Sequence, residues 1–270
     1  RALCAKLSES AGAAHDAALA IMTTDTEPKE CALEFTLAGK TVHIGGMTKG
    51  SGMIHPNMAT MLCCVTTDCA ITKAMLQQAL SEDVKKTFNM ISVDRDTSTN
   101  DTYMVLANGL AGNPLIDGEG EDFDRFCEAL NAVTTCLAKM MAKDGEGAHK
   151  LMEVVVDGAE SHEQAVTLAK SVITSNLVKT ALAGSDANWG RILCAMGYSG
   201  AQFDPETVDI SIASSAGTLA LVRSGVTTDF SEELATAILS QEEVRVDIDI
   251  HLGSECATAW GCDLTHEYID

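Results

Sequence analysis

Residues 49–62 read Lys49-Gly50-Ser51-Gly52-Met53-Ile54-His55-Pro56-Asn57-Met58-Ala59-Thr60-Met61-Leu62. Two glycines and a proline punctuate this loop, which leads through the small Ala59 to Thr60. Thr60 opens an apolar run to Thr67 that contains β-branched residues, as is typical of a central β-strand. A threonine hydroxyl can attack its own preceding carbonyl where the backbone is bent and the preceding residue is small. The stretch therefore predicts self-cleavage between Ala59 and Thr60, at the start of a buried strand.

Cleavage at this bond would give Thr60 a free α-amine beside its own hydroxyl. An α-amine has a pKa of roughly 7.7 to 8.0, against about 10.4 for lysine, so it can be neutral near physiological pH and act as a base. Thr60 would then supply both the nucleophile and the base for acyl transfer. The ordinary alternative is that Thr60 is only a strand residue, since threonine is common in strands.

The loop resembles the cleavage segment of the bifunctional ornithine acetyltransferases of arginine biosynthesis, the glutamate N-acetyltransferase family. Further stretches resemble family blocks in family order, so that the resemblance covers essentially all 270 residues. These stretches are Met22-Thr23-Thr24-Asp25-Thr26 with Pro28-Lys29, Val93-Asp94-Arg95-Asp96-Thr97-Ser98-Thr99-Asn100-Asp101-Thr102, Asp144-Gly145-Glu146-Gly147-Ala148-His149-Lys150, Leu177-Val178-Lys179-Thr180 and Asp186-Ala187-Asn188-Trp189-Gly190-Arg191-Ile192-Leu193.

The resemblance implies transfer of an acetyl group from N-acetylornithine to glutamate through an acetyl-Thr60 ester, without a metal or an organic cofactor. Some members of the family also use acetyl-CoA to acetylate glutamate, and the residues leave that activity open. The resemblance further implies a dimer of cleaved heterodimers, whose halves would be residues 1–59 and 60–270. Two alternatives stay open: a related N-terminal-nucleophile amidase or aminopeptidase, and an inactive truncated fragment.

Substrate contacts are assigned by the resemblance to Thr23, Lys49 and Glu146, together with Thr60. Lys49 lies eleven positions before Thr60, across a flexible loop that could fold it back toward the nucleophile. Glu146 stands between two glycines after a long predicted helix, where a tight backbone can present a carboxylate to a cleft. Without the resemblance, an exposed loop lysine and an exposed loop acid would be the ordinary interpretations.

Periodicity and turn residues predict the remaining elements. Helices are predicted over 11–20, 71–88, 122–141, 161–175 and 232–239, with Asn188 as the N-cap of another over 188–196. Strands are predicted over 21–24, 33–37, 42–44, 60–67, 151–156, 177–182, 208–212, 218–222, 244–250 and 257–260. Helices and strands mix without strict alternation, which favours an α+β fold of layered sheets flanked by helices. The resemblance implies an N-terminal-nucleophile-like architecture, and an exposed acidic loop suggests a boundary between two lobes near 112–122.

Composition excludes several classes of protein. The chain carries 18 Lys and Arg against 39 Asp and Glu, a net charge of −21, which disfavours nucleic acid and anionic membranes as partners. The negative charge suits a cationic small molecule such as ornithine, although an acidic surface can also have no role other than keeping a protein soluble.

No apolar run approaches the about 20 residues of a membrane helix. The ten cysteines lack metal-ligand spacing, so we expect no structural metal and mostly buried thiols in a reducing compartment, the cytoplasm or, in a eukaryote, the mitochondrial matrix or a plastid.

The sequence also departs from the family pattern. An upstream Thr-Gly pair that helps form the oxyanion hole is not in this chain, nor are the Asn and the terminal Ser or Thr that follow a segment like Tyr268-Ile269-Asp270, so we expect a chain truncated at both ends. Arg95 stands where the family usually has glycine. A side chain there predicts a strained turn with positive φ.

Overall fold

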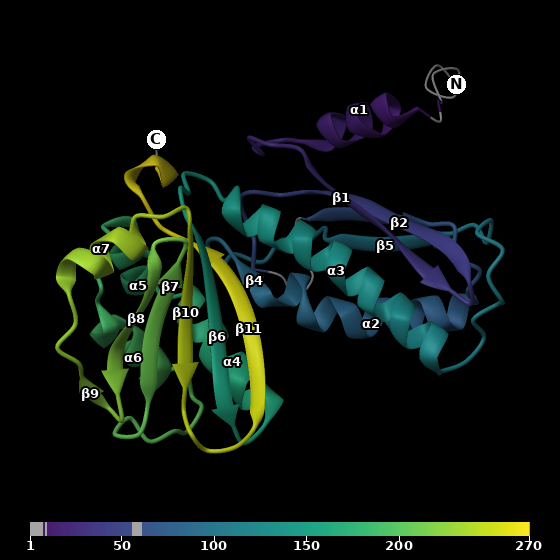
Figure 1. Cartoon of the computed structure of the whole chain (residues 1–270). Helices are drawn as coiled ribbons and strands as arrows, with labels where there is room; N and C mark the ends of the chain where they lie inside the picture. Colours follow the sequence, from purple (N-terminus) through teal and green to yellow (C-terminus); the bar gives the residue numbers. More distant parts are fainter. Residues whose placement is uncertain (1–7, 9, 56–60, 270) are drawn as a thin grey trace.

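The computed structural model describes residues 8, 10–55 and 61–269. Within these ranges, two β-sheets are joined by a long helix (Figure 1). The first sheet has the strand order β1-β2-β3-β5, in which β3 is parallel to β5 and the other neighbours are antiparallel. Its strands are β1 (Lys29–Leu37), β2 (Lys40–Lys49), β3 (Leu62–Thr67) and β5 (Thr102–Ala107).

The second sheet has seven strands in the order β4-β11-β6-β10-β7-β8-β9. The neighbours β6 and β10 are parallel, as are β4 and β11, and the remaining pairs are antiparallel. The strands are β4 (Ile91–Ser92), β6 (Leu151–Ala159), β7 (Asp209–Ser214), β8 (Gly217–Arg223), β9 (Val226–Thr227), β10 (Glu243–Asp249) and β11 (Glu255–Cys262).

Helices flank both sheets (Figure 1). They are α1 (Ala11–Ile21), α2 (Lys73–Lys86), α3 (Glu121–Lys143), α4 (His162–Ile173), α5 (Asn176–Ala183), α6 (Trp189–Gly197) and α7 (Glu232–Leu239), with the short 3₁₀ helices η2 (Phe88–Met90) and η3 (His266–Tyr268). None of the helices in the described residues is both long and apolar enough to cross a membrane.

Helix α3 connects the two sheets. Its fully buried side chains recur every three or four residues along one face: Phe126, Leu130, Val133, Leu137 and Met141. This face packs against β1 and β2 of the first sheet and reaches β4, β6 and β11 of the second. The apolar residues of both sheets therefore belong to one continuous core. The helix ends at Lys143, directly before the loop that carries Glu146.

The fold confirms the predicted α+β class with layered sheets and flanking helices. Two predicted strands are wrong. Residues 21–24 end α1 and begin a turn, because the carboxylate of Asp25 accepts the backbone N–H of Thr23. Residues 177–182 lie in α5, which is capped by Ser175 and buries Val178, Ala181 and Leu182 at helical spacing. The predicted strand over 60–67 begins at Leu62 in the described chain, and Thr60 lies outside the described residues.

Several local predictions are also tested. Arg95 has φ of +73°, which confirms the left-handed turn expected where the family has glycine. Asn188 caps α6, since its side chain accepts the backbone N–H of Arg191. The expectation of mostly buried thiols is wrong for the described cysteines, all free thiols: Cys63, Cys69 and Cys262 are buried, four are half-buried, and Cys194 and Cys256 are exposed. Cys194 is exposed because α6 turns its other face to the core. The lobe boundary near 112–122 stays a prediction.

Candidate active site

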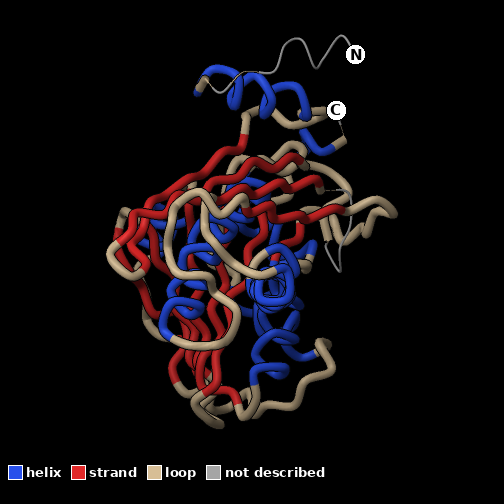
Figure 2. The backbone as a smooth tube through the Cα atoms, turned by 90° about the vertical axis from the view of Figure 1, so that its right-hand side faces the viewer, coloured by secondary structure: helices blue, strands red, loops and turns tan. Residues whose placement is uncertain are grey.

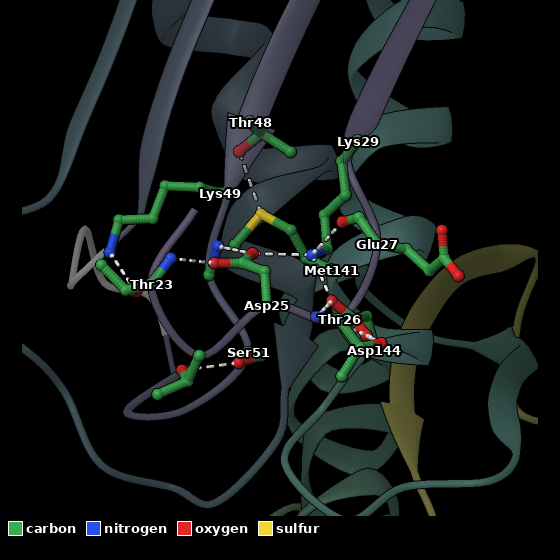
Figure 3. A network of polar contacts seen from close by, with 12 residues as sticks. Thr23, Asp25, Thr26, Glu27, Lys29, Thr48, Lys49, Ser51, Met141 and Asp144 are labelled. Carbon is green, nitrogen blue, oxygen red and sulfur yellow. Dashed lines mark hydrogen bonds and ion pairs between the residues drawn. The ribbon is translucent and has the colours of Figure 1, made fainter. Parts of the chain in front are cut away.

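Three segments that are far apart in the sequence meet at the end of α3 (Figure 3). They are the turn 23–29 between α1 and β1, the end of β2 with the loop 49–54, and the loop 144–147 after α3. Each segment belongs to one of the stretches that resemble family blocks.

In both Figure 1 and Figure 2, α1 and η3 lie at the same end of the molecule. η3 packs on the loop after α3, where Thr265 Oγ1 donates to the Gly147 carbonyl oxygen at 2.6 Å.

Asp25 is the centre of this junction. Its Oδ1 accepts the backbone N–H of Gly50 at 2.6 Å and the ammonium of Lys29 at 2.7 Å, while its Oδ2 accepts the backbone N–H of Thr23 at 3.2 Å. Burial by itself would raise the pKa of the Asp25 carboxyl, but the hydrogen bonds from Lys29, Gly50 and Thr23 together lower it below its ordinary value. The charged carboxylate thus fixes the turn to the residue that follows Lys49.

Lys29 extends the junction to α3. Its side chain is 2% exposed, and its ammonium donates to Asp144 Oδ2 at 2.5 Å and to the Glu27 carbonyl oxygen at 3.2 Å. Thr26 donates its backbone N–H to the same Asp144 carboxylate, and its hydroxyl also donates to it. One buried cation and two carboxylates therefore set the position of the α3 terminus relative to the turn.

Lys49 and Thr23 touch each other. The Lys49 ammonium donates to Thr23 Oγ1 at 3.2 Å (Figure 3), and the Lys49 side chain is buried while Thr23 is exposed. Among the residues that the structure describes, no carboxylate lies within ion-pair distance of this ammonium. Lys49 therefore retains donor capacity for an anionic or carbonyl oxygen, and the residue that it contacts, Thr23, is exposed.

Glu146 lies against the same loop. Its backbone N–H donates to the Ser51 carbonyl oxygen at 2.9 Å, and Ser51 Oγ pairs with Thr24 Oγ1 at 2.8 Å. A Cβ atom on Gly52 would collide with the Glu146 carboxyl group, so an alanine here would push the end of that side chain aside. The Glu146 carboxylate is half-buried and forms no ion pair within the described ranges. The structure thus brings Thr23, Lys49 and Glu146 to one loop.

The predicted cleavage pair, Ala59 and Thr60, lies outside the described residues. The residues on either side of it are anchored to the polar stretch 93–102. On the upstream side, Asp94 accepts the backbone N–H groups of Met53 and Ile54 at 2.5 and 3.0 Å. On the downstream side, Met61 donates its N–H to Asp101 at 2.6 Å. Two carboxylates of the stretch 93–102 therefore hold residues on both sides of the predicted cleavage pair.

Sequence reasoning gave no role to Asp25, Lys29, Asp144 or Asp101, although all four lie in the stretches quoted for the resemblance. Asp25 and Lys29 are four residues apart, but this spacing predicts an ion pair only on a helix, and residues 25–28 form a turn before β1. The pairing of Lys29 with Asp144 spans 115 positions and leaves no local signal. Among the described residues, no group of three or more His, Cys, Asp or Glu side chains is arranged to hold a metal ion.

The fold is of the kind seen in a solved protein of arginine biosynthesis. The crystal structure of arginine biosynthesis bifunctional protein ArgJ from Bacillus halodurans matches with a TM-score of 0.74 and 47% identity, over 78% of this chain and 97% of that chain. Two curated relatives are named arginine biosynthesis bifunctional protein: ArgJ 1 of Clostridium acetobutylicum, 54% identical over 93% of this chain, and ArgJ of Symbiobacterium thermophilum, 54% identical over 100%. This chain spans 61% and 65% of their lengths.

The ArgJ family model matches residues 1–270. The chain belongs to the ArgJ family, which confirms the resemblance drawn from the sequence.

Proposed function

We propose that the protein transfers an acetyl group from N-acetylornithine to glutamate through an ester on Thr60. The observation that carries this proposal is the convergence of Thr23, Lys49 and Glu146 on the loop that leads to the Ala59–Thr60 bond. Membership of the ArgJ family and the names of the relatives support the same reaction. Acetyl-CoA-dependent acetylation of glutamate remains a second proposed activity of the site.

The site offers opposite charges to an amino-acid substrate. The Lys49 ammonium, which has no carboxylate partner among the described residues, binds a substrate carboxylate, and Thr23 orients it. The Glu146 carboxylate binds a substrate ammonium. Ornithine and glutamate both carry an α-carboxylate, and ornithine adds a side-chain ammonium that suits a chain with net charge −21.

The transfer is a double displacement at Thr60. The freed α-amine of Thr60 takes the proton of its hydroxyl, and the oxygen attacks the acetyl carbonyl carbon of N-acetylornithine. The amide C–N bond breaks, ornithine leaves with the proton, and the acetyl group remains on Thr60 as an ester. The amine of glutamate then attacks that ester and restores the hydroxyl. These steps involve Thr60 and the two substrates alone, so the proposal includes no metal or organic cofactor.

We further infer that residues 1–59 and 60–270 stay together after cleavage. The antiparallel pair of β2 and β3 spans the cleavage site from Lys49↔Leu62 to Ile44↔Thr67, so its ladder would join the two pieces. A dimer of such heterodimers and a cytoplasmic location belong to the same proposal.

Product analysis tests the reaction. Purified protein is incubated with N-acetylornithine that carries a labelled acetyl group, with and without glutamate. We expect labelled acetylglutamate only when glutamate is present, and none from Thr60→Ala. Labelled acetate in equal amounts with and without glutamate, and no acetylglutamate, would instead show an amidase and contradict the transfer.

A further inference from the structure

Two half-buried cysteines come from different elements of the fold, Cys31 from the edge strand β1 and Cys136 from α3. Phe35 lies four residues after Cys31 on β1, and so its side chain is on the same face of the sheet. The ring centroid of Phe35 is 6.5 Å from that of Phe126 on α3. The face of β1 that carries Cys31 therefore packs against α3 (Figure 1).

The ladder of β1 and β2 fixes the part of α3 that lies above Cys31. Cys31 pairs with Gly46 of β2, and directly opposite residues of an antiparallel pair share one face of the sheet. A Cβ atom on Gly46 would lie 3.2 Å from Cδ1 of Leu137, so Leu137 lies over Gly46. Cys136 is the residue of α3 before Leu137. Its thiol meets the Cys31 thiol beside Gly46, and the two are hydrogen-bonded to each other.

This contact affects how readily Cys31 ionises. Burial, the hydrogen bond to Cys136 and the negative charge of a thiolate there raise the pKa of the Cys31 thiol to about 12. Cys31 is therefore almost fully protonated at neutral pH, and the first attack on an oxidant falls to Cys136. Once Cys136 is part of a mixed disulfide it carries no charge, and Cys31 then ionises more readily.

We propose that Cys31 and Cys136 form a disulfide when the protein meets a small disulfide oxidant such as oxidised glutathione. The Cys136 thiolate attacks one sulfur of the oxidant, the S–S bond of the oxidant breaks, and one glutathione leaves. The Cys31 thiolate then attacks the Cys136 sulfur and displaces the second glutathione. The two cysteines lose two protons and two electrons, which convert the oxidant into two molecules of reduced glutathione.

The disulfide would connect the two sides of the proposed cleavage site. Cys31 belongs to residues 1–59 and Cys136 to residues 60–270, so the bond joins the two proposed pieces covalently. This consequence rests on the proposed function, whereas formation of the disulfide does not. The ladder of β2 and β3 also joins the pieces, but through hydrogen bonds that a denaturant breaks. The disulfide would survive denaturation and be broken by reductants.

Cys127 offers a matched comparison on the same helix. It is half-buried as well, but its charged neighbours are Asp83 and Lys86 of α2 and Asp124 of α3. The thiol of Cys127 thus lies on the side of α3 that faces α2, away from β1. We expect it to form no bond with Cys31 in the folded protein.

Peptide mapping tests the disulfide whether or not the chain is cleaved. Reduced, folded protein is freed of reductant, incubated with oxidised glutathione, alkylated, and digested with trypsin without reduction. Trypsin releases residues 30–40, which contain Cys31, and residues 126–139, which contain Cys127 and Cys136. We expect these two peptides to be linked, with a mass two hydrogen atoms below their sum, in the wild type and in Cys127→Ser. Cys136→Ser should lose the linked product.

Oxidation in denaturing urea is the control for the role of the fold. Thiols of an unfolded chain pair without guidance from α3 and β1, so the link between residues 30–40 and 126–139 should lose its preference there. Glutathione adducts on Cys136 without linked peptides, or equal yields of the link from folded and unfolded protein, would overturn the proposal.

Non-reducing electrophoresis separates this inference from the proposed function. The oxidised wild type should run as one band, which a reductant separates into residues 1–59 and residues 60–270. If the linked peptides form but the reductant leaves a single band, the proposed cleavage is refuted and the disulfide stands. If the two pieces separate without reductant after oxidation, the cleavage stands and the disulfide is refuted.

Discussion

At the scale of single residues, the position of Lys49 at the end of β2 decides how its side chain is buried and what its ammonium contacts. Its stem is buried at the end of β2, while its ammonium reaches the exposed Thr23. A lysine buried in this way loses much of its hydration, so it gains strongly from an anionic partner. Neither Lys49 nor Thr23 would be singled out by spacing alone, and it is their contact that makes the pair a candidate binding site.

We expect Lys49→Met to weaken acetyl transfer. A hydrogen bond to a charged group contributes about 1.5–3 kcal/mol, which corresponds to a loss of roughly 10- to 150-fold in kcat/KM. Steady-state kinetics with N-acetylornithine as the varied substrate measures the loss. Lys40→Met is the matched control, because Lys40 is exposed at the opposite end of β2. Equal kcat/KM for Lys49→Met and the wild type would remove Lys49 from the site.

Gly52 leaves room for the Glu146 side chain, whose carboxyl group occupies the position of the missing Cβ. We expect Gly52→Ala to push this carboxyl group aside and to lower kcat/KM for acetyl transfer, while the free energy of unfolding changes by less than about 1 kcal/mol, because the end of a flexible, half-buried side chain can move. Steady-state kinetics and urea denaturation measure the two effects. Gly118→Ala should leave kcat/KM unchanged, since a Cβ at Gly118 meets no atom within 4 Å; equal kcat/KM for the two variants would contradict the steric account.

At the scale of elements, the site depends on one buried lysine that ties a turn, a strand end and a helix end together. Lys29 lies on the first residue of β1 and reaches both Asp25 and Asp144. The carboxylate of Asp25 then holds Gly50, and the loop after Asp144 holds Glu146. The relative positions of Lys49 and Glu146 therefore follow from this network rather than from either residue alone.

We expect Lys29→Met to destabilise the protein strongly. Removing the cation leaves two carboxylates without their partner, and breaking a buried ion pair from one side lowers the free energy of unfolding by about 3–5 kcal/mol. Lys143→Met is the contrasting variant, because Lys143 pairs with Glu242 and Glu243 at the surface and such pairs contribute about 0–1 kcal/mol. Chemical denaturation of both variants gives the comparison, and equal losses would contradict a structural role for the network.

The same network makes the free energy of unfolding depend on pH. The pKa of Asp25 is lower in the folded state than its ordinary value of 3.8, so the folded state binds this proton less readily than the unfolded state does. Its stabilising effect is complete above about pH 4 and is lost as the pH falls through the lowered value. We expect Asp25→Asn to reduce the fall in the free energy of unfolding between pH 5 and pH 2. Identical curves for the variant and the wild type would show that Asp25 does not contribute.

At the scale of the whole molecule, local sequence patterns predicted most elements but not their long-range contacts. The helix expected over 232–239 is α7, and the strands expected over 33–37 and 42–44 belong to the longer antiparallel pair β1 and β2. The segment 177–182 was misassigned because its branched apolar residues fit a strand as well as a helix, and the cap at Ser175 decides for the helix. For this short apolar run, the capping residue distinguishes a helix from a strand better than the apolar pattern does.

The candidate site was predicted only in part. The resemblance supplied Thr23, Lys49 and Glu146, and the fold brings them to one loop. The ion pair of Lys29 with Asp144 and the hydrogen bond of Asp101 to Met61 join residues 115 and 40 positions apart. Such pairs depend on how α3 and β5 pack, which local spacing does not encode. The roles of Ala59 and Thr60, outside the described residues, stay predictions from sequence.

The most direct measurement is the intact mass of the purified wild-type chain under denaturing conditions, beside the same measurement on Thr60→Ala. The account predicts two polypeptides for the wild type, residues 1–59 and residues 60–270, and one uncut polypeptide for the variant. Circular dichroism on the same samples establishes that both are folded. A folded wild-type chain that remains a single polypeptide would contradict the central claim that cleavage before Thr60 creates the nucleophile.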